Sequence, residues 1–227
     1  MTLPKPYYDH GGITIYHGDC REILPLLGRF DLLLTDPPYG VDAIRADAQV
    51  RHRFAANATR RWQAHKHEPV AGDDAPFDPS HLLGVAPAAV LWGANNYASR
   101  LPDSPCWLAW DRKDARAADS NITEVELAAV LGHRFKTVRI FRHMWAGFQR
   151  DSEVGSRVLH PTQKPVALMS WCLSFFPEAK TVVDPYMGSG PVAKACKDRG
   201  LRYVGIELVE KYCEIAAKRL AQEVLFA

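Results

Sequence analysis

The sequence predicts an α/β protein whose mostly parallel, doubly wound sheet has about seven strands and is flanked by helices. Short apolar runs rich in β-branched and aromatic residues alternate with helical patterns over most of the chain. The chain has 227 residues, of which 47% are hydrophobic and 24% charged, which suits one domain spanning 1–227 with inserted loops.

The segment Asp31–Asp36 (DLLLTD) is apolar almost throughout, which is typical of a parallel strand buried on both faces. The other short runs have the length and composition of strands. The predicted strands are Ile13–His17, Asp31–Asp36, Ala89–Trp92, Cys106–Trp110, Lys136–Phe141, Thr181–Asp184 and Tyr203–Glu207.

Helical patterns follow most of these strands. Pro165 is tolerated in the first turn of a helix, and Gly200 suits the end of one. Asn121 or Thr123 has a side chain that could cap a helix beginning near 124. The predicted helices are Arg21–Leu27, Ala94–Leu101, Glu124–Leu131, Lys164–Phe176, Gly190–Arg199 and Val209–Leu220.

Two stretches lack a regular pattern and are rich in basic residues. The first, 41–76, is predicted to be a long inserted loop or a mobile helical insertion, and the second covers 142–159. Their basic residues are Arg45, Arg51, Arg53, Arg60, Arg61, Lys66 and neighbouring histidines in the first, and Arg142, His143, Arg150 and Arg157 in the second.

Composition excludes several classes of protein. The net charge of +2 is too small to indicate nucleic-acid binding by itself. The five cysteines form no C-x-x-C pair, and no apolar run reaches the roughly 18–20 residues of a membrane span. We therefore expect reduced thiols and a cytoplasmic protein without a membrane partner. No metal site is expected either, because His65-x-His67 has no evident third ligand.

The first candidate site is the segment TDPPYG, where the predicted strand ends at Asp36. Pro37 and Pro38 give a stiff turn without backbone donors, which leaves its carbonyl groups free as acceptors. A carboxylate and a carbonyl can orient the two N–H bonds of an aromatic amino group, so that its lone pair faces an electrophile. Tyr39 can stack on the base that carries the amino group.

The second candidate site is the segment TVVDPYMGSG, in which another strand ends in Asp-Pro before a glycine-containing turn. Gly188 and Gly190 allow positive φ and a close approach of the backbone to a ligand. The next predicted strand ends at Glu207, where an acidic residue suits ribose hydroxyls. The fingerprint G-x-G-x-x-G is absent, which argues against a nicotinamide dehydrogenase.

These segments resemble the motifs of the β-type DNA amino-methyltransferases, the DPPY family. TDPPYG is similar to their motif IV, DPYMGSG to their motif I (with Tyr186 where Phe is commoner), HPTQKP to their HPTxKP segment, and HGDC to their GDC segment. The order of the motifs also matches the β-type arrangement. The resemblance implies a Rossmann-like S-adenosylmethionine methyltransferase fold and methylation of adenine N6, for which the acidic DPPY form is typical.

The resemblance also implies the roles of individual residues. The catalytic residues would be Asp36, Pro37, Pro38 and Tyr39. The residues that bind S-adenosyl-L-methionine would be Asp19, Cys20, Asp36, Thr162, Lys164, Asp184, Pro185, Tyr186, Met187, Gly188, Ser189, Gly190, Glu207 and Leu208. In this scheme Asp19 faces the adenine amino group of the cofactor, Glu207 binds its ribose, and Lys164 pairs with its carboxylate.

DNA is the expected partner, and the target base must be flipped out of the duplex. The two basic stretches are expected to contact phosphate, with Trp62, Trp145 or Phe148 as wedges between bases. Relatives of the β type are often homodimers. Alternative functions are methylation of cytosine N4, methylation of RNA or protein, and binding of DNA without catalysis.

Overall fold

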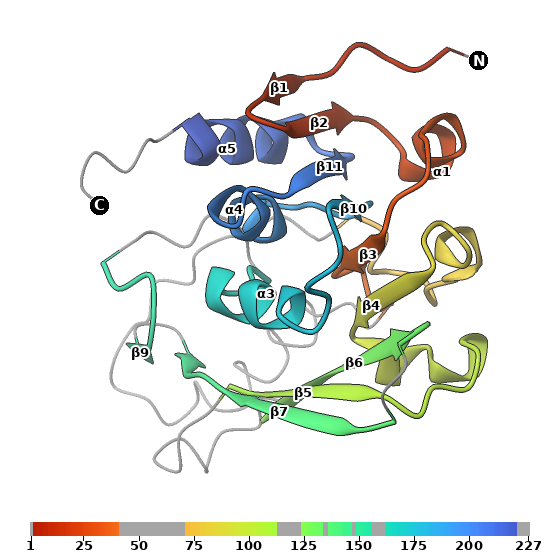
Figure 1. The fold of residues 1–227 in the computed structure, drawn as a ribbon, viewed down its shortest axis with the longest axis vertical. Helices are drawn as coiled ribbons and strands as arrows, with labels where there is room; N and C mark the ends of the chain where they lie inside the picture. The colour runs from red at the N-terminus through yellow and green to blue at the C-terminus, as the bar shows by residue number, and fades with distance from the viewer. Residues whose placement is uncertain are drawn as a thin grey trace, which may run out of the picture.

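The computed structural model describes residues 2–40, 71–112, 124–133, 136–146, 149–155 and 162–221. Within these ranges, nine strands form one sheet in the order β1-β2-β11-β10-β3-β4-β6-β5-β7 (Figure 1). They are β1 (Tyr8–His10), β2 (Ile13–His17), β3 (Leu32–Thr35), β4 (Ala88–Trp92), β5 (Trp107–Asp111), β6 (Val125–Leu131), β7 (Val138–Arg142), β10 (Thr181–Asp184) and β11 (Arg202–Glu207). The predicted α/β class is confirmed, although seven strands were expected.

Helices cover both faces of this sheet. Helices α3 (Val166–Leu173), α4 (Pro191–Asp198) and α5 (Glu210–Ala221) lie together on one face, and α1 (Cys20–Ile23) lies on the other (Figure 1). Single turns of 3₁₀ helix complete the second layer at Leu24–Leu26, Ser80–Leu82, Ala94–Asn96 and Ala98–Arg100. The molecule therefore has the layered architecture that alternating strands and helices produce.

Strand β3 lies at the centre of the sheet, and this position explains why its sequence is apolar. Leu32 and Leu34 pack against the layer of α3, α4 and α5, whereas Leu33 packs against the opposite layer, and none of the three is exposed. The strand runs parallel to β10 on one side and to β4 on the other. The carboxyl ends of β3 and β10 are therefore neighbours, and ligands of such sheets bind beyond these ends.

The prediction of a helix over Glu124–Leu131 is wrong, because this segment forms strand β6. The strand is antiparallel to both β4 and β5 and lies between them. Its alanines suit a helix, but Ala128 packs on one layer of the core and Ala129 on the other, as alternation in a strand requires. Pairing on both sides has overridden local propensity. The proposed capping residues Asn121 and Thr123 lie outside the described residues.

Smaller differences concern the ends and the type of single elements. The helix expected over Ala94–Leu101 is two separate 3₁₀ turns, and β1 was not predicted. Helix α3 is shorter than Lys164–Phe176, since Pro165 is its N-cap and its regular turns end at Leu173. The stretch 142–159 contains a small hairpin, β8 (Trp145–Ala146) with β9 (Gln149–Arg150). Residues 41–70 of the basic insertion lie outside the described residues.

All five cysteines are buried and none forms a disulfide in the structure, so they pack as small apolar side chains. In the ranges that the structure describes, no helix has the length and apolar character needed to cross a membrane.

Replacing Leu34 by Ala should lower the free energy of unfolding by about 2–5 kcal/mol, because the side chain is fully buried in the central strand. Leu3, which is 42% exposed, provides the matched control, and Leu3→Ala should change stability little. Urea denaturation of both variants measures the difference. Equal losses in the two variants would contradict the central position of β3.

Candidate active site

The TDPPYG segment lies where β3 ends at the carboxyl edge of the sheet. Thr35 is fully buried, and its hydroxyl donates a hydrogen bond of 2.7 Å to Oδ1 of Asp184, the last residue of β10. This bond ties the first candidate site to the second across neighbouring strands. The side chain of Asp36 follows directly and is 19% exposed. The structure therefore brings the two motifs, 149 residues apart in sequence, to one edge.

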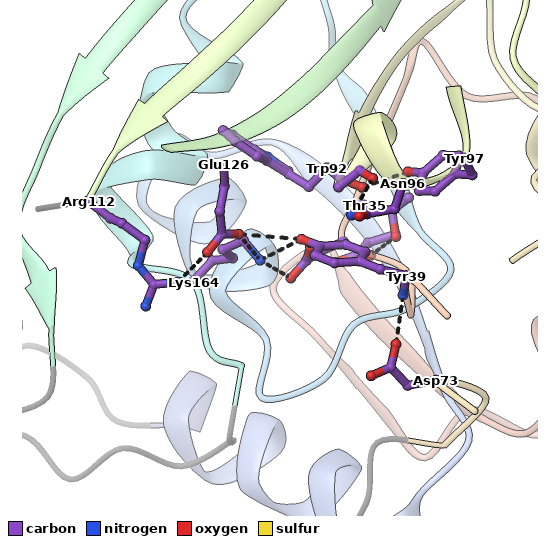
Figure 2. A network of polar contacts seen from close by, with 12 residues as sticks. Thr35, Tyr39, Asp73, Trp92, Asn96, Tyr97, Arg112, Glu126 and Lys164 are labelled. Atoms are coloured by element: carbon purple, nitrogen blue, oxygen red, sulfur yellow. Dashed lines mark hydrogen bonds and ion pairs between the residues drawn. The ribbon is translucent and has the colours of Figure 1, made fainter. Parts of the chain in front are cut away.

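The turn after Asp36 is held by groups from two other segments. The carboxylate of Asp73 accepts hydrogen bonds from the backbone N–H groups of Tyr39 and Gly40, at 3.1 and 2.9 Å (Figure 2). The ring of Tyr39 lies against Gly93, where a Cβ atom would come within 1.9 Å of the ring. Gly93 has φ of 69°, which glycine adopts without cost. Neither Asp73 nor Gly93 was a predicted site residue.

Tyr39 points its hydroxyl into a cluster of charged side chains (Figure 2). The hydroxyl donates to Oδ1 of Asp36 at 2.5 Å and accepts a hydrogen bond of 2.9 Å from the ammonium of Lys164. The same ammonium lies 2.6 Å from Oδ2 of Asp36 and 3.1 Å from Oε2 of Glu126. The other oxygen of Glu126 accepts from Arg112 at 2.5 Å. The TDPPYG turn is thus part of a network of alternating charges.

Burial and neighbouring charges shift the pKa values of this cluster in different directions. Burial raises the pKa of Asp36, and the adjacent Lys164 only partly offsets this effect. Burial would also raise the pKa of Glu126, but Lys164 and Arg112 outweigh it and lower that pKa. The pKa of Lys164 is raised, because the two carboxylates outweigh the burial that would lower it. The ammonium and the carboxylate of Glu126 are therefore charged at neutral pH.

The second motif forms a turn whose acidic residues are bonded to the protein. Asp184 is buried and accepts bonds from the backbone N–H of Tyr186 at 3.2 Å and from the hydroxyl of Tyr203 at 3.2 Å, besides that of Thr35. Burial raises its pKa to about 7, and these hydrogen bonds oppose the shift. Asp184 therefore acts mainly to hold the turn together. Gly188 and Gly190 have positive φ of 54° and 75°, as the sequence predicts.

Glu207 at the end of β11 joins this turn from the next strand. Its two oxygens accept from the backbone N–H groups of Gly188 and Val209, each at 2.8 Å. The segment after β2 lies beside it, because the N–H of Gly18 donates to the carbonyl of Glu207 at 2.9 Å. Asp19 caps α1 by accepting from the N–H of Arg21 at 2.8 Å. The acidic residues of HGDC and GIEL therefore share the edge that carries Asp184.

The remaining predicted cofactor residues differ in exposure. Cys20, Pro185, Met187 and Ser189 are buried, Tyr186 is partly buried, and Thr162 and Leu208 are exposed. The hydroxyl of Tyr186 contacts the ring nitrogen Nε2 of His81 at 2.8 Å, a partner that the commoner Phe could not bind. Lys164 has protein partners in place of the predicted cofactor carboxylate, and that role stays a prediction. His160 of the HPTQKP segment lies outside the described residues.

Glu126 and Arg112 are charged residues of the site that the sequence analysis missed. Arg112 directly follows β5, so its position beyond a predicted strand was a usable signal. Glu126 could not be found in this way, because its segment was assigned to a helix. Since β6 is antiparallel to its neighbours, its first residues lie at the edge where the parallel strands end. Glu126 therefore reaches the site from the beginning of its strand.

Replacing Gly93 by Ala should lower the free energy of unfolding by about 1–3 kcal/mol more than replacing Gly84, because the new methyl group overlaps the ring of Tyr39. Gly84 is a matched control, since it also has positive φ but nothing within 4 Å of an added Cβ. Chemical denaturation of both variants makes the comparison. An equal loss at the two positions would show that the contact with Tyr39 is unimportant.

Comparison with known proteins agrees with this arrangement. A model of the N6_N4_Mtase family, described as DNA methylase, matches residues 104–218, which include the DPYMGSG and GIEL segments. The type II methyltransferase M.ScaI of Streptomyces caespitosus is 26% identical over 98% of this chain and 86% of its own. Its alignment therefore also extends over the TDPPYG segment.

Solved structures of DNA methyltransferases share the fold. The complex of M1.HpyAVI with SAM is 21% identical, covers 92% of this chain and 100% of its own, and has a TM-score of 0.52. The cytosine-N4-specific PvuII DNA methyltransferase is 12% identical, covers 98% of this chain and 91% of its own, and has a TM-score of 0.66. Since the family model spans half of the sequence and its match contains the glycine turn beside Asp184, the chain belongs to the N6_N4_Mtase family of DNA methylases.

Proposed function

We propose that this chain is a DNA methyltransferase that transfers a methyl group from S-adenosyl-L-methionine to adenine N6. The observation that carries the proposal is the Thr35–Asp184 hydrogen bond, which sets the DPPY turn beside the glycine turn. An acceptor clamp for an amino group and a turn suited to a nucleoside thus share one edge of the sheet. The acidic form of the clamp favours adenine over cytosine.

The catalytic turn acts by orienting the target nitrogen. The carboxylate of Asp36 and the carbonyl of Pro37 accept hydrogen bonds from the two N–H groups of the target amino group. This arrangement aims the nitrogen lone pair at the methyl donor. Pro38 keeps the turn rigid. Tyr39, fixed against Gly93 and bonded to Asp36, offers its ring to the flipped base. Most of the acceleration then comes from positioning and electrostatics, without a covalent enzyme intermediate.

The residues of the glycine turn fit S-adenosyl-L-methionine. Asp19 and Glu207 supply carboxylate oxygens at neighbouring strand ends, as an amino group and a ribose diol require. Gly188 and Gly190 let the backbone approach the ligand closely. When bound, the cofactor supplies an electrophilic methyl group. The remaining proposed contacts are Cys20, Asp36, Thr162, Lys164, Asp184, Pro185, Tyr186, Met187, Ser189 and Leu208.

We further propose that the basic insertion 41–76 contacts DNA phosphate within the single domain 1–227. In the second stretch, Arg142 supports the same role because its side chain is 74% exposed. Trp145, however, is 6% exposed and packs in the core under Arg150, so its predicted role as a wedge between bases is wrong. Trp62 and Phe148 lie outside the described residues and stay candidates for that role.

Replacing Asp36 by Ala should reduce methyl transfer at least on the order of 100- to 1,000-fold, because the amino group loses its charged acceptor. The cofactor should largely still bind, because Asp36 is one of many proposed contacts, and calorimetric titration measures this binding separately from transfer. Asp103→Ala removes an exposed carboxylate elsewhere and serves as the control. Analysis of the methylated nucleosides identifies the product, and N4-methylcytosine in place of N6-methyladenine would overturn the proposed target.

Reversing the charges of Arg60 and Arg61 to Glu should weaken DNA binding and make its dependence on salt shallower. The slope of the logarithm of the binding constant against the logarithm of salt concentration should fall by about two if each residue contacts one phosphate. The matched control reverses Arg29 and Lys136, which are exposed and precede β3 and β7 at the opposite edge of the sheet. Binding isotherms at several salt concentrations give the slopes. An unchanged slope in the Arg60/Arg61 variant would count against the insertion as a DNA-contact region.

A further inference from the structure

The charged cluster behind the catalytic turn draws its members from four separate segments. Asp36 follows β3, and Arg112 follows β5. Glu126 is the second residue of β6, where it pairs with Trp110 of β5, and Lys164 precedes α3. Their side chains are 19%, 14%, 25% and 4% exposed. A cation as buried as Lys164 requires compensating partners, since an unpaired charge there would be strongly destabilising.

We propose that Glu126 is a positioning residue for methyl transfer, which holds Lys164 so that Asp36 remains a strong hydrogen-bond acceptor for the target amino group. This inference rests on the proposed role of Asp36. Glu126 itself touches neither the base nor the cofactor in this scheme. It acts through the ammonium of Lys164, which lies between the two carboxylates.

Three acceptors of the protein surround the ammonium. A lysine has three N–H donors. Those of Lys164 are directed to Oδ2 of Asp36, the hydroxyl of Tyr39 and Oε2 of Glu126, at 2.6, 2.9 and 3.1 Å. Each oxygen of Asp36 receives one bond from this set, because Tyr39 donates to Oδ1. Since a carboxylate oxygen can accept two hydrogen bonds, Asp36 keeps capacity for the amino group.

Glu126 is held in place from the opposite side. Arg112 binds its Oε1 at 2.5 Å, and the guanidinium lies over the ring of Trp110 at 5.3 Å. Strand β6 also pairs Glu126 directly with Trp110 of β5, so backbone and side chain have the same anchor. Glu126 therefore cannot follow Lys164 toward Asp36. The ammonium is shared between two fixed carboxylates.

Removing the charge of Glu126 would leave Asp36 as the only carboxylate bonded to the ammonium. The lone pairs of Asp36 would then be drawn more strongly toward Lys164, and the carboxylate would become less basic. A less basic acceptor binds the N–H bonds of the target more weakly. Glu126 thus sets how strongly Lys164 acts on the catalytic carboxylate.

The groups facing Asp36 predict the direction of the effect on pH dependence. They are Lys164 before α3, Tyr39 in the same turn, Glu126 on β6, Asp184 on β10 and Tyr97 after β4. Glu126 raises the pKa of Asp36 and Lys164 lowers it. Because transfer requires ionised Asp36, loss of the Glu126 charge should move the acid limb of the pH–rate profile to lower pH. Loss of the Lys164 charge should move it to higher pH.

The experiment compares kcat/KM for DNA against pH in the full-length enzyme and in three variants. Glu126→Gln should move the acid limb down by about one pH unit and lower the plateau on the order of tenfold. Lys164→Gln should move the limb up. Glu178→Gln, an exposed change of the same kind at the opposite edge, should overlay the wild type. An acid limb of Glu126→Gln that is unmoved or moves up would overturn the inference.

Two further measurements separate this role from simple structural support. Glu126→Asp keeps the charge with a shorter reach, so it should retain the wild-type acid limb while the plateau falls; a limb like that of Glu126→Gln would contradict the proposal. If Glu126→Gln does not fold, the plateau of the aspartate variant decides the matter, and a plateau equal to that of the wild type would contradict the proposal. Absence of DNA methylation by the wild type would instead refute the proposed function, whereas normal methylation with unshifted limbs refutes only the role of Glu126.

Discussion

The hydrogen bond from Thr35 to Asp184 is the contact on which the site depends. Both of its side chains are buried at the ends of the two central strands, β3 and β10, whose leucines and valines are also fully buried. Parallel pairing of these strands fixes the spacing of their last residues. A threonine at the end of β3 can therefore meet an aspartate that is remote in sequence. This pairing therefore fixes the position of the TDPPYG turn relative to the glycine turn.

Asp184 also illustrates how the same residue type serves opposite purposes at neighbouring strand ends. It is enclosed and receives three donors from Thr35, Tyr186 and Tyr203, so its oxygens are occupied by the protein. Asp36 remains partly exposed and is balanced by a cation. One carboxylate consequently holds the backbone of its turn, while the other keeps part of its surface exposed at the strand end. Burial and partners, not residue type, separate these two roles.

The part of the site that the sequence could predict consists of residues at the ends of strongly apolar strands. Asp36, Asp184 and Glu207 each follow such a run, and the turns after them contain proline or glycine. Glu126 was hidden because VELAAVL has the composition of a helix and became a strand only through pairing with β4 and β5. The partners of Lys164 could not be predicted either, because Asp36 and Glu126 are remote from it in sequence and only the fold brings their charges together.

The carboxylate of Asp73 has a consequence for how the chain can vary. By binding the N–H groups of Tyr39 and Gly40, it fastens the two ends of the intervening segment side by side. The entropic cost of closing a loop grows only slowly with its length once both ends are fixed. Segments of very different length or composition could therefore be exchanged between Gly40 and Asp73 while the TDPPYG turn keeps its shape.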